Sequence, residues 1–109
     1  MAEGAPAVND KTFDAEVTRS AGVVLVDFSA SWCPPCRILA PIITEVAREM
    51  AGKAKVLALD VDESRTTAAT FNVMNVPTMI FFKNGKEVQR LIGVSPKERI
   101  VDAINKLIG

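Results

Sequence analysis

Between Val23 and Val46 the sequence reads VVLVDFSASWCPPCRILAPIITEV, and its pattern changes near the centre. The run Val23–Ser29 is rich in β-branched residues and apolar on both sides except at Asp27, which is typical of a central strand buried on both faces. After it, apolar residues recur at helical spacing, with charged residues on the other side, up to an expected stop near Gly52. A buried strand that passes directly into a helix indicates an α/β fold.

A proline falls inside this predicted helix. Pro41 has no N–H to donate to the carbonyl of Arg37, so we expect a kink with helical turns on both sides of it. The side of the helix expected to face the core consists of Ile38, Leu39, Ile42, Ile43 and Val46.

The segments before and after this stretch alternate in type. Asp10 is placed to cap a helix over Lys11–Ser20, in which Phe13 and Val17 share the buried side. Lys55–Val61 has the pattern of a second buried strand. Strand and helix therefore follow one another along the first half of the chain.

The second half predicts one short helix, a hairpin and a closing helix. Ser64–Phe71 is the short helix, and the strands Thr78–Lys83 and Glu87–Ile92 are joined through Asn84-Gly85, a pair suited to a type I′ turn. Ser95-Pro96-Lys97-Glu98 matches a capping box with proline at the first helical position. The predicted core-facing side of that last helix is Ile100, Val101, Ile104, Leu107 and Ile108.

These elements predict a central mixed β-sheet flanked by helices on both faces, with a right-handed β-α-β crossover. The chain has 109 residues, which is enough for one core and too few for two. We therefore expect a single domain over 1–109, with residues 1–8 as an N-terminal tail or strand.

Composition excludes several function classes. Thirteen basic and thirteen acidic residues cancel, and no basic run is long enough for nucleic-acid binding. The longest apolar stretches are about half a membrane span, so no membrane association is expected. Met1–Val8 has no basic residue ahead of an apolar stretch and does not match a secretory signal, which favours a reducing cytoplasm.

The cysteine and histidine counts narrow the chemistry. With two cysteines and no histidine, a Cys-His nucleophile, a histidine base and a mixed Cys/His metal site are all excluded. Cys33 and Cys36 lie where the strand passes into the helix, so their Cβ atoms should be about 5–6 Å apart, close enough for a disulfide. Unpaired N–H groups and the helix dipole at that position favour a thiolate. The pair is therefore a candidate redox centre.

Two non-catalytic roles for the cysteine pair are weaker candidates. A zinc ion needs four ligands, which this chain could supply only by bridging two copies. A purely structural disulfide would close a loop too short to restrict the unfolded chain much, and it would not persist in a reducing cytoplasm.

Taken together, the motifs of the chain resemble the thioredoxin family. The shared motifs match the family in order and spacing over nearly the whole chain. They are Trp32-Cys33-x-Pro35-Cys36, the preceding Val-Asp27-Phe-Ser-Ala, Pro41 in the following helix, Val76-Pro77-Thr78, and Lys83-Asn84-Gly85 with Gly93. A lone C-x-x-C would be unspecific, whereas the whole set is highly specific. The resemblance implies a thioredoxin fold.

Thiol-disulfide exchange gives each cysteine a role. Cys33, expected to be the more exposed and more acidic thiol, attacks a target disulfide, and Cys36 resolves the mixed disulfide. Resolution needs a base, and Asp27 is the candidate because burial should raise its pKa toward neutrality. The alternative for Asp27 is an ordinary core polar group with satisfied hydrogen bonds.

The resemblance also implies a substrate groove. Pro77 corresponds to the proline that is cis in thioredoxins, and the backbone of Val76 would pair with the substrate, with Trp32 and Gly93 lining the groove. Taken without the resemblance, Trp32 would be a core aromatic and Gly93 a strand end.

Two positions depart from the usual family pattern. Pro34 replaces a glycine, which stiffens the loop that it forms with Pro35 and leaves open the direction in which the redox potential moves. The N–H of Cys36 stays available to the Cys33 thiolate, since a capping group bonds mainly to the second and third helical positions. Ala58 stands where a lysine near the buried aspartate is common, so burial of Asp27 should act unopposed.

The sequence therefore predicts a monomeric protein-disulfide reductase, recharged by a thioredoxin reductase and acting on disulfide-containing proteins. No nucleotide-binding glycine pattern occurs, so no bound cofactor is expected. Two alternatives stay open: a thiol oxidant or isomerase, and a non-catalytic binding module built on the same fold.

Overall fold

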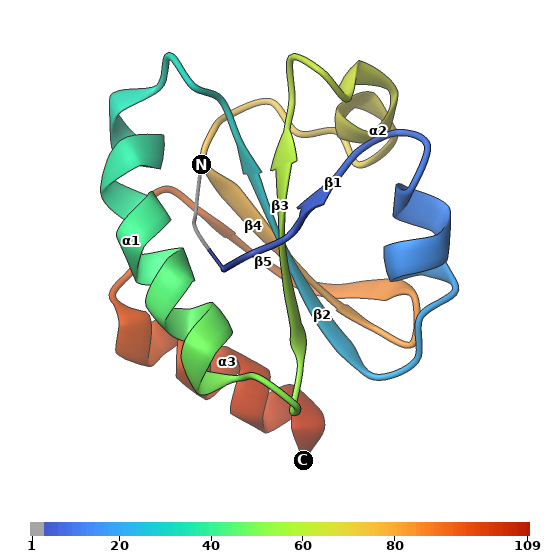
Figure 1. The fold of residues 1–109 in the computed structure, drawn as a ribbon, viewed down its shortest axis with the longest axis vertical. Helices are drawn as coiled ribbons and strands as arrows, with labels where there is room; N and C mark the ends of the chain where they lie inside the picture. Colours follow the sequence, from blue (N-terminus) through green and yellow to red (C-terminus); the bar gives the residue numbers. More distant parts are fainter. Residues whose placement is uncertain (1–3) are drawn as a thin grey trace.

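A mixed sheet of five strands forms the centre of the structure, a computed structural model that describes residues 4–109 (Figure 1). The strands lie in the order β1-β3-β2-β4-β5. The first three in that order run parallel, whereas β4 and β5 are each antiparallel to the neighbour before them. Their bounds are β1 Ala7–Val8, β2 Val23–Ser29, β3 Lys55–Asp60, β4 Thr78–Lys83 and β5 Lys86–Ile92. The predicted mixed sheet is confirmed.

Helices cover both faces of this sheet, as Figure 1 shows. One face packs against α1 and α3 and the other against η1 and α2, because alternate residues of each strand point to opposite sides. The helix bounds are η1 Asp14–Thr18, α1 Pro34–Glu49, α2 Arg65–Thr70 and α3 Lys97–Ile108, of which η1 is a π-helix. The prediction of helices on both faces is therefore confirmed.

The central strand β2 divides the core into two clusters. All seven of its residues are buried, since it has a neighbour strand on each edge and helices above and below. Leu25 packs with Leu39 and Ile104 on the α1 and α3 face, and Val26 packs with Val17 on the other. Asp27 has the same parity as Leu25, so its side chain points toward the α1 face.

The predicted hairpin turn is confirmed. Asn84 and Gly85 both have positive φ, 51° and 84°, as a type I′ turn requires. A Cβ on Gly85 would collide with the backbone oxygen of Thr18 at the end of η1. This turn therefore sets the pairing of Lys83 with Lys86 beside it and the contact of the hairpin with η1, and the register shifts further along, between Phe81 and Phe82.

The predicted helix over Lys11–Ser20 is wrong in extent and in its cap. Asn9, one residue earlier than expected, accepts from the N–H groups of Lys11 and Thr12 at 2.9 and 3.1 Å and forms a local turn. The π-helix itself extends over Asp14–Thr18. The inward placement of Phe13 and Val17 is correct.

Asp10 instead caps a helix that is distant in sequence. Its carboxylate accepts from the N–H of Thr67 at 2.8 Å and from the hydroxyl of Thr67 at 2.7 Å, in the first turn of α2. These hydrogen bonds lower the pKa of Asp10. Ser64, the residue before α2, makes no side-chain cap, and its hydroxyl has no partner among the described residues.

The predicted capping box before α3 is also wrong. Pro96 has an extended backbone with ψ 151°, so it occupies the cap position and the helix begins at Lys97. No side chain caps this helix within the part of the chain that the structure describes. Ile100 and Ile104 are buried as predicted, but Ile108 is 44% exposed, and on α1 the supposedly inward Ile38 is 61% exposed.

Helix α1 continues on both sides of Pro41, as expected. It ends at Glu49, three residues before Gly52. Within residues 4–109, no helix is long and apolar enough to cross a bilayer. Of the expected N-terminal segment, residues 7 and 8 form β1, and residues 1–3 lie outside the described part of the chain.

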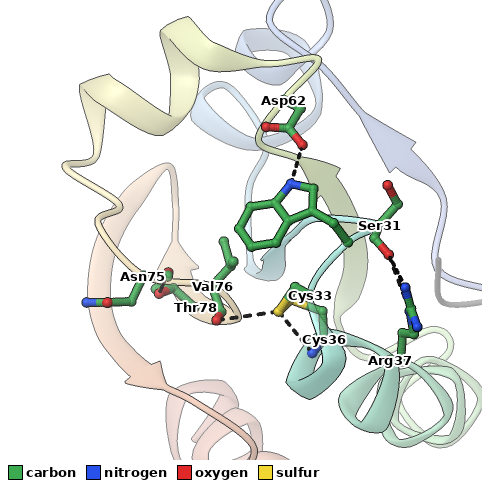
Figure 2. Close-up of a disulfide and its surroundings, with 9 residues drawn as sticks. Ser31, Cys33, Cys36, Arg37, Asp62, Asn75, Val76 and Thr78 are labelled. Carbon is green, nitrogen blue, oxygen red and sulfur yellow. Dashed lines mark hydrogen bonds between the residues drawn. A yellow bond between two sulfur atoms is a disulfide. The ribbon is translucent and has the colours of Figure 1, made fainter.

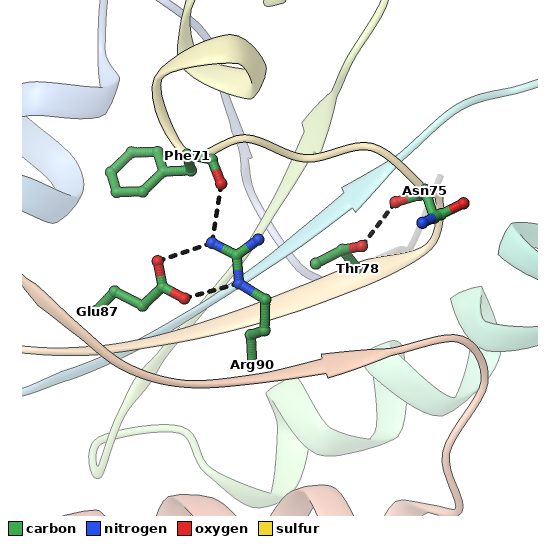
Figure 3. Close-up of polar contacts among 5 residues, drawn as sticks. All are labelled: Phe71, Asn75, Thr78, Glu87 and Arg90. Carbon is green, nitrogen blue, oxygen red and sulfur yellow. Dashed lines mark hydrogen bonds and ion pairs between the residues drawn. The ribbon is translucent and has the colours of Figure 1, made fainter.

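Arg90 on β5 holds the segment that follows α2. Its guanidinium donates to both carboxylate oxygens of Glu87 at 2.7 and 2.8 Å and to the carbonyl oxygen of Phe71 at 2.8 Å (Figure 3). The hydrogen bond to Glu87 raises the pKa of Arg90 above its ordinary value. The loop from Phe71 to Pro77 is therefore anchored at its start.

Candidate active site

The two cysteines lie at the carboxyl end of β2, where the chain turns into α1. Their sulfurs are joined in a disulfide, with Cα atoms 5.2 Å apart (Figure 2). Strand β3 runs parallel to β2 and ends at the same edge of the sheet, so the loops that follow β2 and β3 meet here. The predicted spatial pairing of Cys33 with Cys36 is confirmed.

Cys33 is the cap of α1. Its backbone is extended, with φ −96° and ψ 110°, and its Sγ accepts from the N–H of Cys36 at 3.2 Å. Pro34 and Pro35 occupy the first two helical positions and have no N–H, so the N–H of Cys36 is the first donor that the helix offers. The predicted contact between this N–H and the Cys33 sulfur is confirmed.

The two sulfur-bearing residues do not differ in exposure. Cys33 and Cys36 are each 3% exposed in the disulfide form, so the expectation that Cys33 is the more exposed is wrong for this state. Both pack with Ala30, and Val61 and Val76 border the cluster. The two sulfurs therefore differ in their hydrogen bonding: the sulfur of Cys33 accepts a hydrogen bond from the N–H of Cys36 in the first turn of α1.

A second loop faces the disulfide. The Val76–Pro77 peptide bond is cis, and the carbonyl oxygen of Val76 lies 3.6 Å from the Cys33 sulfur (Figure 2). The hydroxyl of Thr78 donates to the carbonyl of Asn75 at 2.6 Å, which closes the loop around the cis bond. The N–H of Gly93 donates to the carbonyl of Pro77 at 2.9 Å, so the end of β5 borders the same place.

Trp32 lies on the surface beside the disulfide and is 62% exposed, so it is not a core aromatic. Its indole N–H donates to the carboxylate of Asp62 at 2.7 Å (Figure 2). Sequence reasoning missed Asp62. The available signal was its position shortly after the buried strand β3, at the sheet edge where the cysteines also lie.

Asp27 is 2% exposed, and one of its carboxylate oxygens has no hydrogen-bond partner among the described residues. Burial raises its pKa to about 7. It is paired across the sheet with Ala58 on β3 and Met79 on β4. The structure thus places a buried carboxyl on the α1 face of the sheet, one inward position before Ser29 at the end of the strand.

The geometry agrees with a match to known proteins: a family model described as Thioredoxin covers residues 5–106. The chain belongs to the thioredoxin family. It is also similar to the thioredoxins of Staphylococcus aureus strains Mu50, MW2 and COL, each 46% identical over 99 residues that span 91% of this chain and 93% of theirs.

Membership in the thioredoxin family settles the general activity. The chain is a disulfide oxidoreductase that works by dithiol/disulfide exchange through a closely spaced cysteine pair. The thioredoxin family implies disulfide-containing substrates and a reductase that restores the dithiol. The predicted thioredoxin fold is confirmed.

The two departures from the usual thioredoxin pattern are visible in the structure. Pro34 is exposed at the first position of α1, where it leaves the bond from Cys36 to the Cys33 sulfur intact. Ala58 is the register partner of Asp27, as predicted. Burial is the cause of the raised pKa of Asp27, and no cationic side chain of the described residues opposes it.

Proposed function

We propose that this thioredoxin-family protein is a general protein-disulfide reductase in which Cys33 attacks and Cys36 resolves. The observation that supports this assignment is the hydrogen bond from the Cys36 N–H to the Cys33 sulfur at the start of α1. In the reduced protein this N–H and the helix dipole stabilise a thiolate on Cys33. Cys36, inside the first turn, receives no comparable donor among the described residues.

The exchange proceeds in two displacements. The Cys33 thiolate attacks one sulfur of the substrate disulfide, forming a mixed disulfide and releasing one substrate thiolate. Cys36 then loses its proton and attacks the Cys33 sulfur, which releases the second substrate thiolate and forms the internal disulfide. Two electrons pass from the protein dithiol to the substrate.

Asp27 is proposed as the base that accepts the proton of Cys36. Its support is a pKa of about 7, which matches the working pH of a general base, and its placement on the α1 face. Replacement Asp27→Asn should slow resolution at least about tenfold and remove the inflection near pH 7 from its pH profile. If the profile keeps that inflection, Asp27 is not the base.

The surface between Trp32 and the cis-proline loop is proposed as the groove that holds the substrate as an extended strand. The backbone of Val76 offers main-chain hydrogen bonds there, as when a peptide adds a strand to a sheet edge. Trp32 and Gly93 border the groove, and the two prolines keep the helix start in place. Cys33 is thereby presented to a substrate sulfur.

The direct test is reduction of insulin by dithiothreitol, comparing the intact chain with two variants. Cys33→Ser should abolish the acceleration, and Cys36→Ser should accumulate a mixed disulfide between Cys33 and insulin. Full activity of Cys33→Ser would contradict the assignment. Equilibration with glutathione buffers should give a potential below that of glutathione, as a reductase requires.

We also propose that the protein acts as a single-domain monomer in the cytoplasm, recharged by a thioredoxin reductase. A reducing compartment keeps the dithiol available, and the neutral overall charge gives no attraction to nucleic acid. Sedimentation equilibrium at micromolar concentration should return one chain mass. A dimer mass would overturn the monomer.

A further inference from the structure

Met74, in the loop between α2 and β4, has the most exposed large apolar side chain of the described residues, at 79%. The other methionines of the described part of the chain, Met50 and Met79, are buried at 2% and 0% exposed. Within residues 4–109, only the thioether of Met74 is therefore open to a reagent in solution.

The loop that carries Met74 is tied to the sheet on both sides of this residue. At its start, Arg90 donates to the carbonyl of Phe71 at 2.8 Å, and at its end the hydroxyl of Thr78 donates to the carbonyl of Asn75 at 2.6 Å (Figure 3). Met74 lies between these two anchors. The path of the backbone therefore holds its side chain at the surface.

This position brings Met74 next to the proposed substrate groove. The carbonyl oxygen of Val76, two residues further on, lies 3.6 Å from the Cys33 sulfur (Figure 2). Two residues span at most about 7 Å, so the Cα atom of Met74 is no further than this from that of Val76. A substrate strand that pairs with the Val76 backbone would lie within reach of the long, flexible methionine side chain.

Other exposed apolar side chains border the same place. Trp32 lies beside the disulfide, and Ile92 and Val94 flank Gly93, whose N–H donates to the carbonyl of Pro77. Docking of a substrate here buries apolar surface, and methionine is well suited to such contacts because its side chain adapts to different partners.

We propose that Met74 is a modification site: hydrogen peroxide oxidises its thioether to methionine sulfoxide, and the sulfoxide weakens the docking of protein substrates. The inference rests on the proposed function, because it requires a substrate in the groove. In the reaction, the sulfur attacks one peroxide oxygen, the O–O bond breaks and an S–O bond forms, and the other oxygen leaves as water. The sulfur loses two electrons and the peroxide gains them.

The sulfoxide changes docking and leaves the thiol chemistry as it was. Its oxygen is polar, and burying it against an apolar substrate surface without a hydrogen bond is costly. The thiolate of Cys33 depends on the N–H of Cys36 at the start of α1, to which Met74 makes no contribution. The reactivity of Cys33 toward a small reagent should therefore be unchanged.

Peptide mapping after peroxide treatment tests where oxidation occurs. The protein is treated in its disulfide form, so that neither of its two cysteines is a free thiol that competes for peroxide. Met74 should be oxidised at least about tenfold faster than Met50 and Met79, because their sulfurs are buried. Equal rates at the three positions would overturn the proposal.

Insulin reduction tests what the sulfoxide does, with each treated protein compared with its own untreated sample. Once Met74 is fully converted, kcat/KM for insulin should fall about threefold or more in the native chain. The fall should be absent in Met74→Leu, which cannot form the sulfoxide. It should persist in Met50→Leu, the matched control that keeps Met74. An unchanged kcat/KM in the treated native chain, or an equal fall in Met74→Leu, would contradict the proposal.

Alkylation separates docking from thiol chemistry. Dithiothreitol reduces the disulfide and leaves the sulfoxide in place, so Cys33 can be labelled with iodoacetamide in the treated protein. Its rate should equal that of untreated protein, and a fall parallel to the loss of insulin reduction would reject the docking explanation. Absence of insulin reduction in the untreated protein would instead reject the proposed function. Normal insulin reduction before and after treatment would reject the role of Met74 alone.

Discussion

At the scale of single residues, the most unusual group is a carboxyl buried without a cation. Asp27 is 2% exposed and one of its oxygens lacks a hydrogen-bond partner among the described residues. A satisfied core aspartate, which the sequence alone also allows, would have both oxygens bonded. Burial makes ionisation of Asp27 unfavourable in the folded state but not in the unfolded state. The free energy of unfolding therefore depends on pH.

Replacement of Asp27 by asparagine should remove part of that pH dependence. The pKa of Asp27 is raised by burial from 3.8 to about 7, so the folded state binds the proton more tightly than the unfolded state. The contribution of this group is therefore fully present below about pH 4 and is lost as pH rises through about 7, a loss of about 4 kcal/mol.

Urea unfolding between pH 4 and 9 measures this effect. The free energy of unfolding of the native protein should decline over this range by about 4 kcal/mol more than that of Asp27→Asn. Asp102→Asn, at an exposed position of α3, is the matched control and should leave the decline intact. Parallel curves for the native protein and Asp27→Asn would show that burial does not perturb this carboxyl.

At the scale of elements, the register between β2 and β3 decides what stands beside Asp27. Ala58 is its partner across the sheet. Side chains of partners in adjacent strands lie on the same face, at about the strand spacing of 4.8 Å. A cation at position 58 would therefore face the carboxyl in a setting with little screening.

Ala58→Lys should lower the pKa of Asp27, because a nearby positive charge favours the carboxylate. The measurement is an NMR titration of the Asp27 carboxyl carbon. Ala58→Met, of similar length and without charge, controls for crowding and should leave the pKa raised. An equal pKa in the lysine and methionine variants would mean that the side chain at 58 does not reach Asp27.

The sequence predicted the elements whose signals are local. The β-branched run of β2, the helical period of α1 and the Asn84-Gly85 turn each depend on neighbouring residues, and each is observed at or near its predicted bounds. The cap of α2 could not be predicted this way. Asp10 and Thr67 are 57 positions apart, so only the folded chain brings them together.

The candidate site likewise contains some features that local sequence signals predict and others that they do not. The cysteine pair and the bond from the Cys36 N–H follow from a helix start, which is local. The contact of Trp32 with Asp62 depends on two strand ends meeting at one sheet edge, and no sequence motif predicts it. A cleft between β2 and α1, lined in part by Cys36, is a space that a linear sequence does not display.

At the scale of the whole molecule, the hairpin and η1 are tied together at the edge of the sheet far from the disulfide. Gly85 approaches the backbone of Thr18 so closely that a Cβ would collide with it. Gly52 has nearly the same φ, 82° against 84°, but open space around it. Comparing alanine substitutions at these two glycines therefore separates the cost of backbone strain from the cost of a collision with η1.

Gly85→Ala should destabilise the protein more than Gly52→Ala does. Each variant forces alanine into a left-handed backbone, which costs roughly 1–2 kcal/mol, and Gly85→Ala adds overpacking of roughly 1–3 kcal/mol. Urea unfolding of both variants at one pH gives the difference. Equal losses of stability would mean that the hairpin does not press against η1 in solution.

The chemistry of the whole molecule depends on the thiolate of Cys33 being stabilised by the start of α1, and alkylation of the reduced protein tests this most directly. With iodoacetamide at pH 7, Cys33 should react about tenfold or more faster than Cys36, and its rate should fall on acidification with an apparent pKa clearly below the ordinary value of about 8.5. Equal, slow labelling of both cysteines, with a midpoint near about 8.5 for each, would contradict it.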